Sequence, residues 1–171
     1  SATPAAPLAD SLAHSGRTLS THPMSVRPQT RANPVRIPGA PWVLVVDDSA
    51  PVREFMKEVL APLQFNIDTA DSGEKAIGMT AGRDYACIFL DVMLPGVDGY
   101  QVCKLIKSKP TGKRTPVIML TSRGSPFDRI RGSMAGCDSY LTKPVEEEKL
   151  RAVVTKILAA HGHGAPVMGR A

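Results

Sequence analysis

The feature that most constrains the fold is an alternation of short apolar runs with helical patterns, which begins at Trp42 and continues to Ala160. Each apolar run covers four or five residues and is followed by a segment with helical periodicity. This alternation is typical of βαβ units around a parallel sheet. We therefore expect an α/β domain with five parallel strands at residues 42–46, 66–70, 86–90, 117–120 and 139–142.

The first and last helical patterns of this region are the clearest. Ser49 is placed to cap the first helix, whose predicted core face is formed by Val52, Phe55, Met56, Val59 and Leu60. The last helix is expected to begin at the acidic run 146–148, because acidic side chains are favourable at a helix N-terminus. Its predicted core face is formed by Leu150, Val153, Val154 and Ile157.

The two ends of the chain differ in composition from residues 42–160. Residues 1–41 contain prolines at positions 4, 7, 23, 28, 34, 38 and 41 and few large apolar residues, which predicts a disordered leader or linker. The Arg-rich, acid-poor leader also resembles a transit peptide, but its prolines interrupt the amphipathic helix that such a peptide needs. Residues 161–171 are expected to form a flexible tail.

The charge of the chain sits mostly outside the predicted domain. The formal net charge is +5, yet residues 41–160 contain 16 basic and 15 acidic residues. Such a neutral body lacks the concentrated basic patch that duplex recognition usually needs, so we expect no nucleic-acid binding through this domain.

The cysteines and the hydropathy of the chain indicate its compartment. Cys87, Cys103 and Cys137 are odd in number and lack CxxC spacing, so neither a disulfide framework nor a zinc site is indicated. No apolar stretch reaches the roughly 18 residues of a membrane span. We expect a cytoplasmic protein without membrane association.

Polar residues stand where the apolar runs end. Asp47 and Asp48 follow the first run, Asp91 the third, Thr121 the fourth, and Lys143 comes just after the fifth. The carboxyl ends of parallel strands meet at one edge of the sheet, where ligands bind. One such residue alone would be an ordinary solvated strand end, whereas four ends with complementary chemistry predict a site.

The chemistry of these residues suits a metal and a phosphate. Clustered carboxylates repel one another, by about 4 kcal/mol for a pair 4 Å apart at an effective dielectric of 20. Oxygen ligands of this kind suit Mg²⁺, which also bridges phosphate oxygens, whereas no EF-hand loop for calcium is present. Asp91 could attack phosphorus and form an aspartyl phosphate, with Lys143 and Thr121 stabilising charge on the phosphoryl oxygens.

Four motifs together resemble those of the CheY-like receiver domains of two-component response regulators. They are Asp47-Asp48, DVMLPGVDG from Asp91, the pair Thr121-Ser122, and YLTKP from Tyr140, in that order. The resemblance spans residues 42–160. It implies a doubly wound, flavodoxin-like parallel sheet with strand order 2-1-3-4-5, an order carried over from the family.

The resemblance also implies a role for each matching residue. Asp91 would be the phosphoacceptor, and Lys143 would contact the phosphoryl group. Magnesium would be bound by Asp48, Asp91 and the backbone carbonyl of Met93, with Asp47 acting through a water molecule. Thr121 and Tyr140 would be the switch residues, and the Lys143-Pro144 bond would be cis.

The implied function is signalling, not the enzymatic turnover of a substrate. The four histidines, His14, His22, His161 and His163, lie outside the domain, so the phosphoryl donor must be another molecule, and the resemblance points to a sensor histidine kinase. The output would be a phosphorylation-dependent protein contact. The stretch from DGYQVCKLIK to YLTKP also resembles single-domain regulators of type IV pilus twitching motility, which suggests a target in a motility or pilus system.

Two other functions are considered: a phosphatase that also forms an aspartyl phosphate, and a DNA-binding regulator that also contains a receiver. A phosphatase of the haloacid-dehalogenase type would place its DxDx motif after the first strand, where this chain has DDSA. A DNA-binding regulator would need an output domain outside this chain, because the 11 residues after Ala160 are too few for a helix-turn-helix.

Overall fold

The computed structural model describes residues 36–122 and 126–160. The chain divides into a unit of residues 1–34, which lies outside this described part, and a unit of residues 35–171. The predicted tail at 161–171 and all but the last residues of the predicted leader also lie outside it. Across the described residues, no helix combines the length and the apolar character that crossing a membrane requires.

The sheet has five parallel strands in the order β2-β1-β3-β4-β5, which confirms the predicted order. The strands are β1 (Trp42–Val46), β2 (Asn66–Ala70), β3 (Cys87–Asp91), β4 (Val117–Thr121) and β5 (Ser139–Thr142). Every residue of β3 and β4 is buried, as expected of central strands that are covered on both faces.

Strands β3 and β4 each end one residue later than predicted, and β3 also begins one residue later, at Cys87. The ladder pairs Asp91 with Leu120 and Thr121 with Thr142, so Asp91 and Thr121 are the last residues of their strands. The prediction ended each strand at the last apolar residue. Main-chain hydrogen bonding does not depend on side-chain polarity, so the ladder continues through both polar residues.

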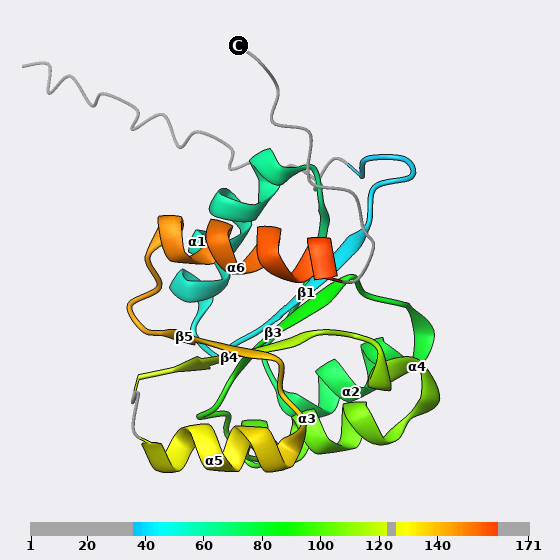
Figure 1. Cartoon of the computed structure of the whole chain (residues 1–171). Helices are drawn as coiled ribbons and strands as arrows, with labels where there is room; N and C mark the ends of the chain where they lie inside the picture. Colours follow the sequence, from blue (N-terminus) through cyan, green and yellow to red (C-terminus); the bar gives the residue numbers. More distant parts are fainter. Residues whose placement is uncertain (1–35, 123–125, 161–171) are drawn as a thin grey trace, which may run out of the picture. The chain divides into compact units, whose positions relative to one another are not determined.

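Helices cover both faces of the sheet. The helices are α1 (Ala50–Leu60), α2 (Gly73–Gly82), α3 (Gly99–Ser108), α4 (Pro110–Lys113), α5 (Pro126–Ala135) and α6 (Glu147–Ala160), with a 3₁₀ turn η1 (Ala61–Leu63). Helices α1 and α6 lie on one face, and α2, α3 and α5 lie on the other (Figure 1). The short α4 and η1 were not predicted, and each has a proline in its first turn, where proline favours helical geometry.

The core consists of two clusters of buried residues, one on each face of the sheet. Along β1, Val43 and Val45 contribute to the cluster under α1 and α6, whereas Leu44 and Val46 contribute to the other. This alternation follows from the two-residue repeat of a strand. The two clusters hold β1, β3 and β4 rigidly and thereby position the ends of these strands.

The predicted core faces of α1 and α6 are mostly confirmed. Met56, Val59 and Leu60 are buried, and Val52 packs against the core, but Phe55 is 36% exposed, so its assignment to the core was wrong. The apolar stripe on α1 is wider than the surface that the sheet and α6 cover, and Phe55 lies at its margin. On α6 the buried residues are Leu150, Val154, Ile157 and Leu158, with Val153 packed against them.

Candidate functional site

The polar residues at the strand ends lie at one edge of the sheet. Asp47 and Asp48 directly follow β1, Asp91 ends β3, Thr121 ends β4, and Lys143 directly follows β5. These four strands are consecutive neighbours in the sheet. Asp47, Asp91 and Thr121 are buried, and Asp48 is exposed. The structure therefore brings together the side chains that the sequence placed at separate strand ends.

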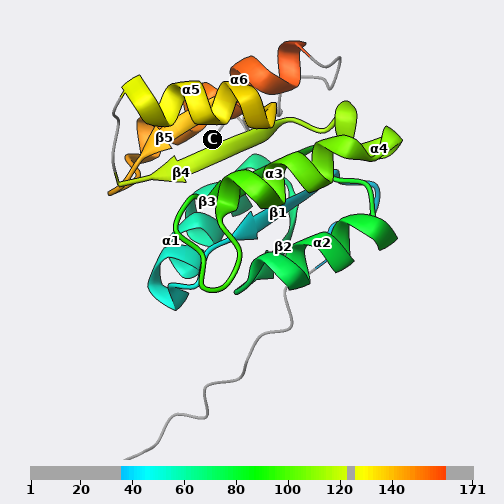
Figure 2. The same ribbon diagram turned by 90° about the horizontal axis from the view of Figure 1, so that it is seen from below.

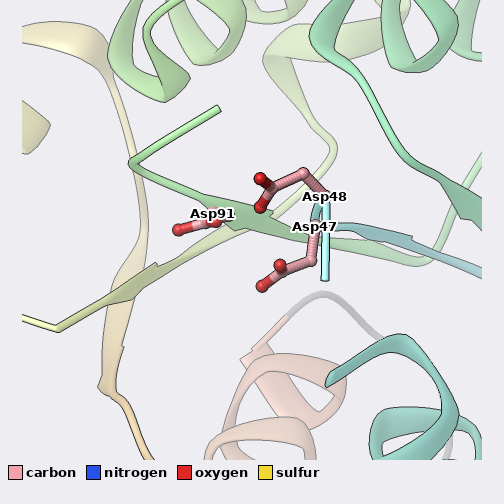
Figure 3. A group of neighbouring side chains, drawn as sticks. All are labelled: Asp47, Asp48 and Asp91. Atoms are coloured by element: carbon pink, nitrogen blue, oxygen red, sulfur yellow. The ribbon is translucent and has the colours of Figure 1, made fainter. Parts of the chain in front are cut away.

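The three aspartates form a compact cluster. One carboxylate oxygen from each of Asp47, Asp48 and Asp91 lies within 4.8 Å of the others. Their side chains point to the same side of the strand ends (Figure 3). At this separation a pair of negative charges repels by about 3.5 kcal/mol at an effective dielectric of 20. Such a cluster has the ligand type and the charge to bind a divalent cation.

Lys143 lies between two of these carboxylates. Its Nζ is 2.5 Å from Asp47 Oδ2 and 3.2 Å from Asp91 Oδ2. Burial alone would lower the pKa of Lys143, but the hydrogen bond to Asp47 and the charges of Asp91 and Asp47 outweigh it and raise the pKa. The side chain is therefore an ammonium ion. Three carboxylates and one ammonium leave two negative charges, which is the charge that one divalent cation neutralises.

Asp91 is held in an environment that opposes its ionisation. Burial first, and then the charge of Asp47, raise the pKa of the Asp91 carboxyl, whereas the Met93 amide and Lys143 act in the opposite direction. The Met93 N–H donates to Asp91 Oδ1 at 3.1 Å. A raised pKa means a more basic carboxylate oxygen, and a more basic oxygen is the better nucleophile.

The start of α1 is arranged around Asp47. Ser49 occupies the N-cap position with extended backbone angles, as predicted, but its side chain makes no capping hydrogen bond, so that part of the prediction was wrong. Instead, the Ser49 N–H donates to Asp47 Oδ1 at 2.9 Å. Arg53, which the sequence reasoning did not identify, donates through Nη1 to the Asp47 carbonyl at 2.6 Å. The Ser49 bond orients the Asp47 carboxylate, and the Arg53 bond anchors α1 to the Asp47 backbone.

The loop between β3 and α3 approaches the Asp91 backbone closely. A Cβ added at Gly99 would lie 2.1 Å from the Asp91 carbonyl oxygen, so only glycine fits there. Gly96 has a φ of 81°, in the left-handed region that favours glycine. Asp98 caps α3 by accepting from the Tyr100 N–H at 2.7 Å. The loop holds Met93, which is 73% exposed, beside Asp91.

The two predicted switch residues lie on adjacent strands. The Thr121 carbonyl accepts from the Lys143 N–H at 2.8 Å, which ties β4 to the segment that carries the lysine. Tyr140, on β5, is half-buried and packs against the core cluster on the α5 side. A Cβ added at Gly132 of α5 would overlap the Tyr140 hydroxyl oxygen, so the ring can occupy this position only opposite a glycine. Nothing in the sequence pattern singled out Gly132.

The Lys143-Pro144 peptide bond is cis, as the family resemblance implied.

Comparison with known proteins identifies the domain. Residues 43–155 match the model of the response regulator receiver domain. The chain is 40% identical over 112 residues to Protein PilG of Pseudomonas aeruginosa, a match that covers 66% of this chain and 83% of that protein. It is also 40% identical over 117 residues to the transcriptional regulatory protein ResD of Bacillus subtilis, covering 68% of this chain but only 46% of ResD.

A solved structure supports the same assignment. The receiver domain of the sensor histidine kinase PA1611 from Pseudomonas aeruginosa PAO1 superposes with a TM-score of 0.66 at 26% identity, covering 70% of this chain and 98% of that one. That structure contains a magnesium ion coordinated in its active-site cleft. The receiver family is a family of signalling domains, and the matched model is not that of a haloacid-dehalogenase phosphatase. The chain belongs to the response regulator receiver family of two-component signalling systems.

Proposed function

We propose that this receiver accepts a phosphoryl group on Asp91 from a sensor histidine kinase and signals through a protein-binding surface that phosphorylation changes. The observation that carries the proposal is the placement of Asp91. It is a buried carboxylate at a strand end, 3.2 Å from the Lys143 ammonium and within 4.8 Å of two further carboxylates. This arrangement combines a nucleophile with groups that can neutralise an incoming phosphoryl group.

The donor set fits Mg²⁺. Asp48, Asp91 and the backbone carbonyl of Met93 would bind the ion, and Asp47 would act through a water molecule. When bound, Mg²⁺ supplies two positive charges that polarise the phosphoryl oxygens. The negative charge excess of the cluster and the magnesium in the PA1611 receiver support this assignment.

The residues of the chain can then perform the transfer by positioning and charge neutralisation. An oxygen of Asp91 attacks phosphorus as the bond between phosphorus and the donor imidazole nitrogen breaks. The bonding electron pair stays on that nitrogen, which takes up a proton. Lys143 stabilises negative charge on the phosphoryl oxygens, and the Thr121 hydroxyl donates a hydrogen bond to one of them. The chemistry is limited to phosphorylation and dephosphorylation of the domain itself.

The signal would leave the site through Thr121 and Tyr140. A phosphoryl group adds about two negative charges and three acceptor oxygens, so it attracts the Thr121 hydroxyl. Movement of Thr121 changes the space beside β5, where the Tyr140 ring packs against α5. The surface formed by α5, β5 and α6 would then change. Its proposed target is a cytoplasmic protein of a motility or pilus system, in keeping with the resemblance of residues 98–144 to twitching-motility regulators and with the similarity to Protein PilG.

Substitution of Asp91 tests the phosphoacceptor. We expect Asp91→Asn to abolish stable labelling by acetyl phosphate or phosphoramidate, because the amide retains the shape but loses the nucleophilic charge. Intact-mass spectrometry measures the labelled fraction. Asp71→Asn, at an exposed aspartate outside the site, is the matched control and should label like wild type. Undiminished labelling of Asp91→Asn would exclude this phosphoacceptor.

Substitution of Thr121 tests the coupling step. Beryllofluoride, a phosphoryl analogue, should still bind Thr121→Ala in the presence of Mg²⁺, but most of the amide chemical-shift changes in β5 and α6 should disappear. Thr142→Ala is the control, because Thr142 is exposed and lies opposite Thr121 in the ladder. If the shift changes in Thr121→Ala matched those of wild type, the signal would leave the site by another route.

A further inference from the structure

The nearly neutral charge of the domain conceals a strong asymmetry. Residues 99–137 contain eight basic residues and one acidic residue. The remainder of the domain, residues 41–98 and 138–160, contains eight basic and fourteen acidic residues. Helices α3, α4 and α5 of this segment lie on the same face of the sheet (Figure 2) and carry Lys104, Lys107, Lys113 and Arg131. Lys107 and Arg131 pair with Asp138 and Asp98, whereas Lys104 and Lys113 are exposed and form no ion pair among the described residues, so they leave positive charge on this face that attracts acidic groups.

The same face exposes large apolar side chains. Among the described residues, Leu105 on α3 is 48% exposed, and Ile130 and Met134 on α5 are 58% and 81% exposed. Ile130 and Met134 are four residues apart and therefore lie on the same side of α5. Of these three side chains, Met134 lines a hollow between the two helices, and an exposed apolar side chain in a hollow indicates an interaction site.

A hollow of about 220 Å³ lies between α3 and α5. We call it the α3–α5 groove, and it is lined by Tyr100, Gln101, Lys104, Arg131, Met134 and Ala135. Met134 and Ala135 supply apolar surface, and Lys104 and Arg131 supply positive charge. Lys104 forms no ion pair with another residue in the described part of the chain, so its charge is available to a partner.

One wall of the groove is held in place by two contacts of Arg131. Its guanidinium lies over the Tyr100 ring at 4.7 Å, and its Nη2 is 2.9 Å from Asp98 Oδ2. Both contacts join α5 to the start of α3. The groove is thus preorganised, which lowers the entropic cost of binding a partner.

We propose that the α3–α5 groove binds an acidic amphipathic helix of a partner protein. A groove between two helices accepts a helix whose apolar side chains recur at i, i+3 or i+4, and i+7. The lining residues span 100–104 on α3 and 131–135 on α5, about 7 Å of each helix, so the groove receives the central one to two turns of the partner helix. Flanking Asp or Glu residues would pair with Lys104 and with the other basic residues of this face. The methionine can adapt its shape to the apolar side chains of the partner.

A nucleic acid fits the same face less well. Its phosphates would satisfy the basic residues but would leave Leu105, Ile130 and Met134 against a polar backbone. The groove shares α5 with the proposed α5-β5-α6 output surface, but its other wall is α3, which is not part of that surface. The inference therefore goes beyond the proposed phosphotransfer and can be tested on the unmodified chain.

A synthetic peptide tests the proposal. The probe is a helical peptide of about 14 residues with leucines at positions i, i+3, i+4 and i+7 and glutamates on both flanks. Titration of ¹⁵N-labelled protein without phosphoryl donor should shift amides of α3 and α5 selectively. We expect Met134→Glu and Lys104→Glu each to weaken binding by about tenfold or more, as truncation of a central contact does. Lys156→Glu, an exposed charge reversal on α6, should leave affinity within about twofold.

Four results would overturn the proposal. The first is that the glutamate peptide does not bind, and the second is that the same peptide binds equally well with lysines in place of its glutamates. The third is that a DNA oligonucleotide binds more tightly through the same residues. The fourth is that the protein self-associates and that Met134→Glu abolishes this self-association. The last result would assign the groove to a second copy of the chain. Because Met134 and Lys104 are exposed, both variants should keep the wild-type melting temperature, which separates lost binding from lost folding. Asp91 plays no part in the assay, so failure here leaves the phosphotransfer proposal untouched.

Discussion

The two edges of the sheet differ in how their polar groups are satisfied. At the carboxyl edge, three carboxylates lie within 4.8 Å of one another and share a single lysine. At the amino edge, the buried Asn66 is fully engaged with the segment before β1. Its Oδ1 accepts from the Ile37 N–H at 2.7 Å, and its Nδ2 donates to the carbonyls of Ile37 and Ala40 at 2.8 and 3.0 Å.

Charges at the amino edge are also balanced. The Arg83 guanidinium lies 3.4 Å over the ring of Trp42, and its Nε is 3.5 Å from Asp68 Oδ2. The Tyr85 hydroxyl donates to the same Asp68 oxygen at 2.8 Å. Only Arg83 Nη1 is buried without a hydrogen-bond partner in the described part of the chain, and the Trp42 ring partly compensates it through the cation–π contact.

The two edges of the sheet therefore have different roles, since the amino edge stabilises the fold and the carboxyl edge forms the candidate site. Opposite charges at the amino edge, and the hydrogen bonds of Asn66 and Tyr85, stabilise the fold. Like charges at the carboxyl edge oppose folding but create the potential that binds a cation and a phosphoryl group. Substitutions at the amino edge should therefore lower stability and leave phosphorylation intact, whereas substitutions at the carboxyl edge should abolish phosphorylation without lowering stability.

Removal of Mg²⁺ should have the largest effect, and it should act on the carboxyl edge alone. With EDTA in place of Mg²⁺, we expect the rate of phosphorylation by phosphoramidate to fall by about 100-fold or more, because several kcal/mol of charge stabilisation are lost. Mass spectrometry over time measures the rate. Asn66→Ala, at the other edge, should retain the same dependence on Mg²⁺. Equal rates with and without the ion would remove the distinction between the two edges.

Asn66→Ala should cause the next largest effect, on stability. The substitution leaves the Ile37 N–H and two carbonyls without the partner they have in the structure, which we expect to lower the free energy of unfolding by about 1–3 kcal/mol. Chemical denaturation measures the difference. Ser133→Ala, at an exposed position on α5, should change stability by no more than about 0.5 kcal/mol. A loss as small as that of the control would show that the segment before β1 does not stabilise the domain.

Asp91→Asn should have the smallest effect on stability and the opposite sign. Burial and Asp47 raise the pKa of Asp91, so its ionised form is less favourable in the fold than in the unfolded chain. A neutral amide removes this cost, and we expect a gain on the order of 1 kcal/mol at neutral pH in EDTA. The comparison is wild type against Asp91→Asn in the same denaturation assay. A clear loss of stability would mean that the Asp91 charge stabilises the fold through Lys143.

Most of the fold could be predicted because the sequence pattern is local. The apolar runs located all five strands, with errors of one residue at β3 and β4. The helical spacing located the buried residues of α1 and α6, except for Phe55. The end of a strand is set by main-chain hydrogen bonds to the neighbouring strand. The exposure of Phe55 is set by the width of the surface that packs against α1. Neither can be read from the pattern of apolar residues along the sequence.

The candidate site was predictable in membership but not in geometry. The topological rule that the ends of parallel strands meet at one edge was sufficient to gather Asp47, Asp91, Thr121 and Lys143. It could not show that Lys143 contacts two carboxylates at once, or that Arg53 binds the Asp47 carbonyl. These contacts depend on side-chain direction, which packing selects.

The sequence by itself determined the α/β class, the order of chemistry along the chain and, through family resemblance, the receiver assignment. Only the tertiary structure decided which residues share space. Gly132 makes room for the Tyr140 hydroxyl, and Met134 faces a groove whose other wall is α3. Periodicity and motifs record what each segment does alone, whereas a cavity or a close approach exists only after distant segments pack together.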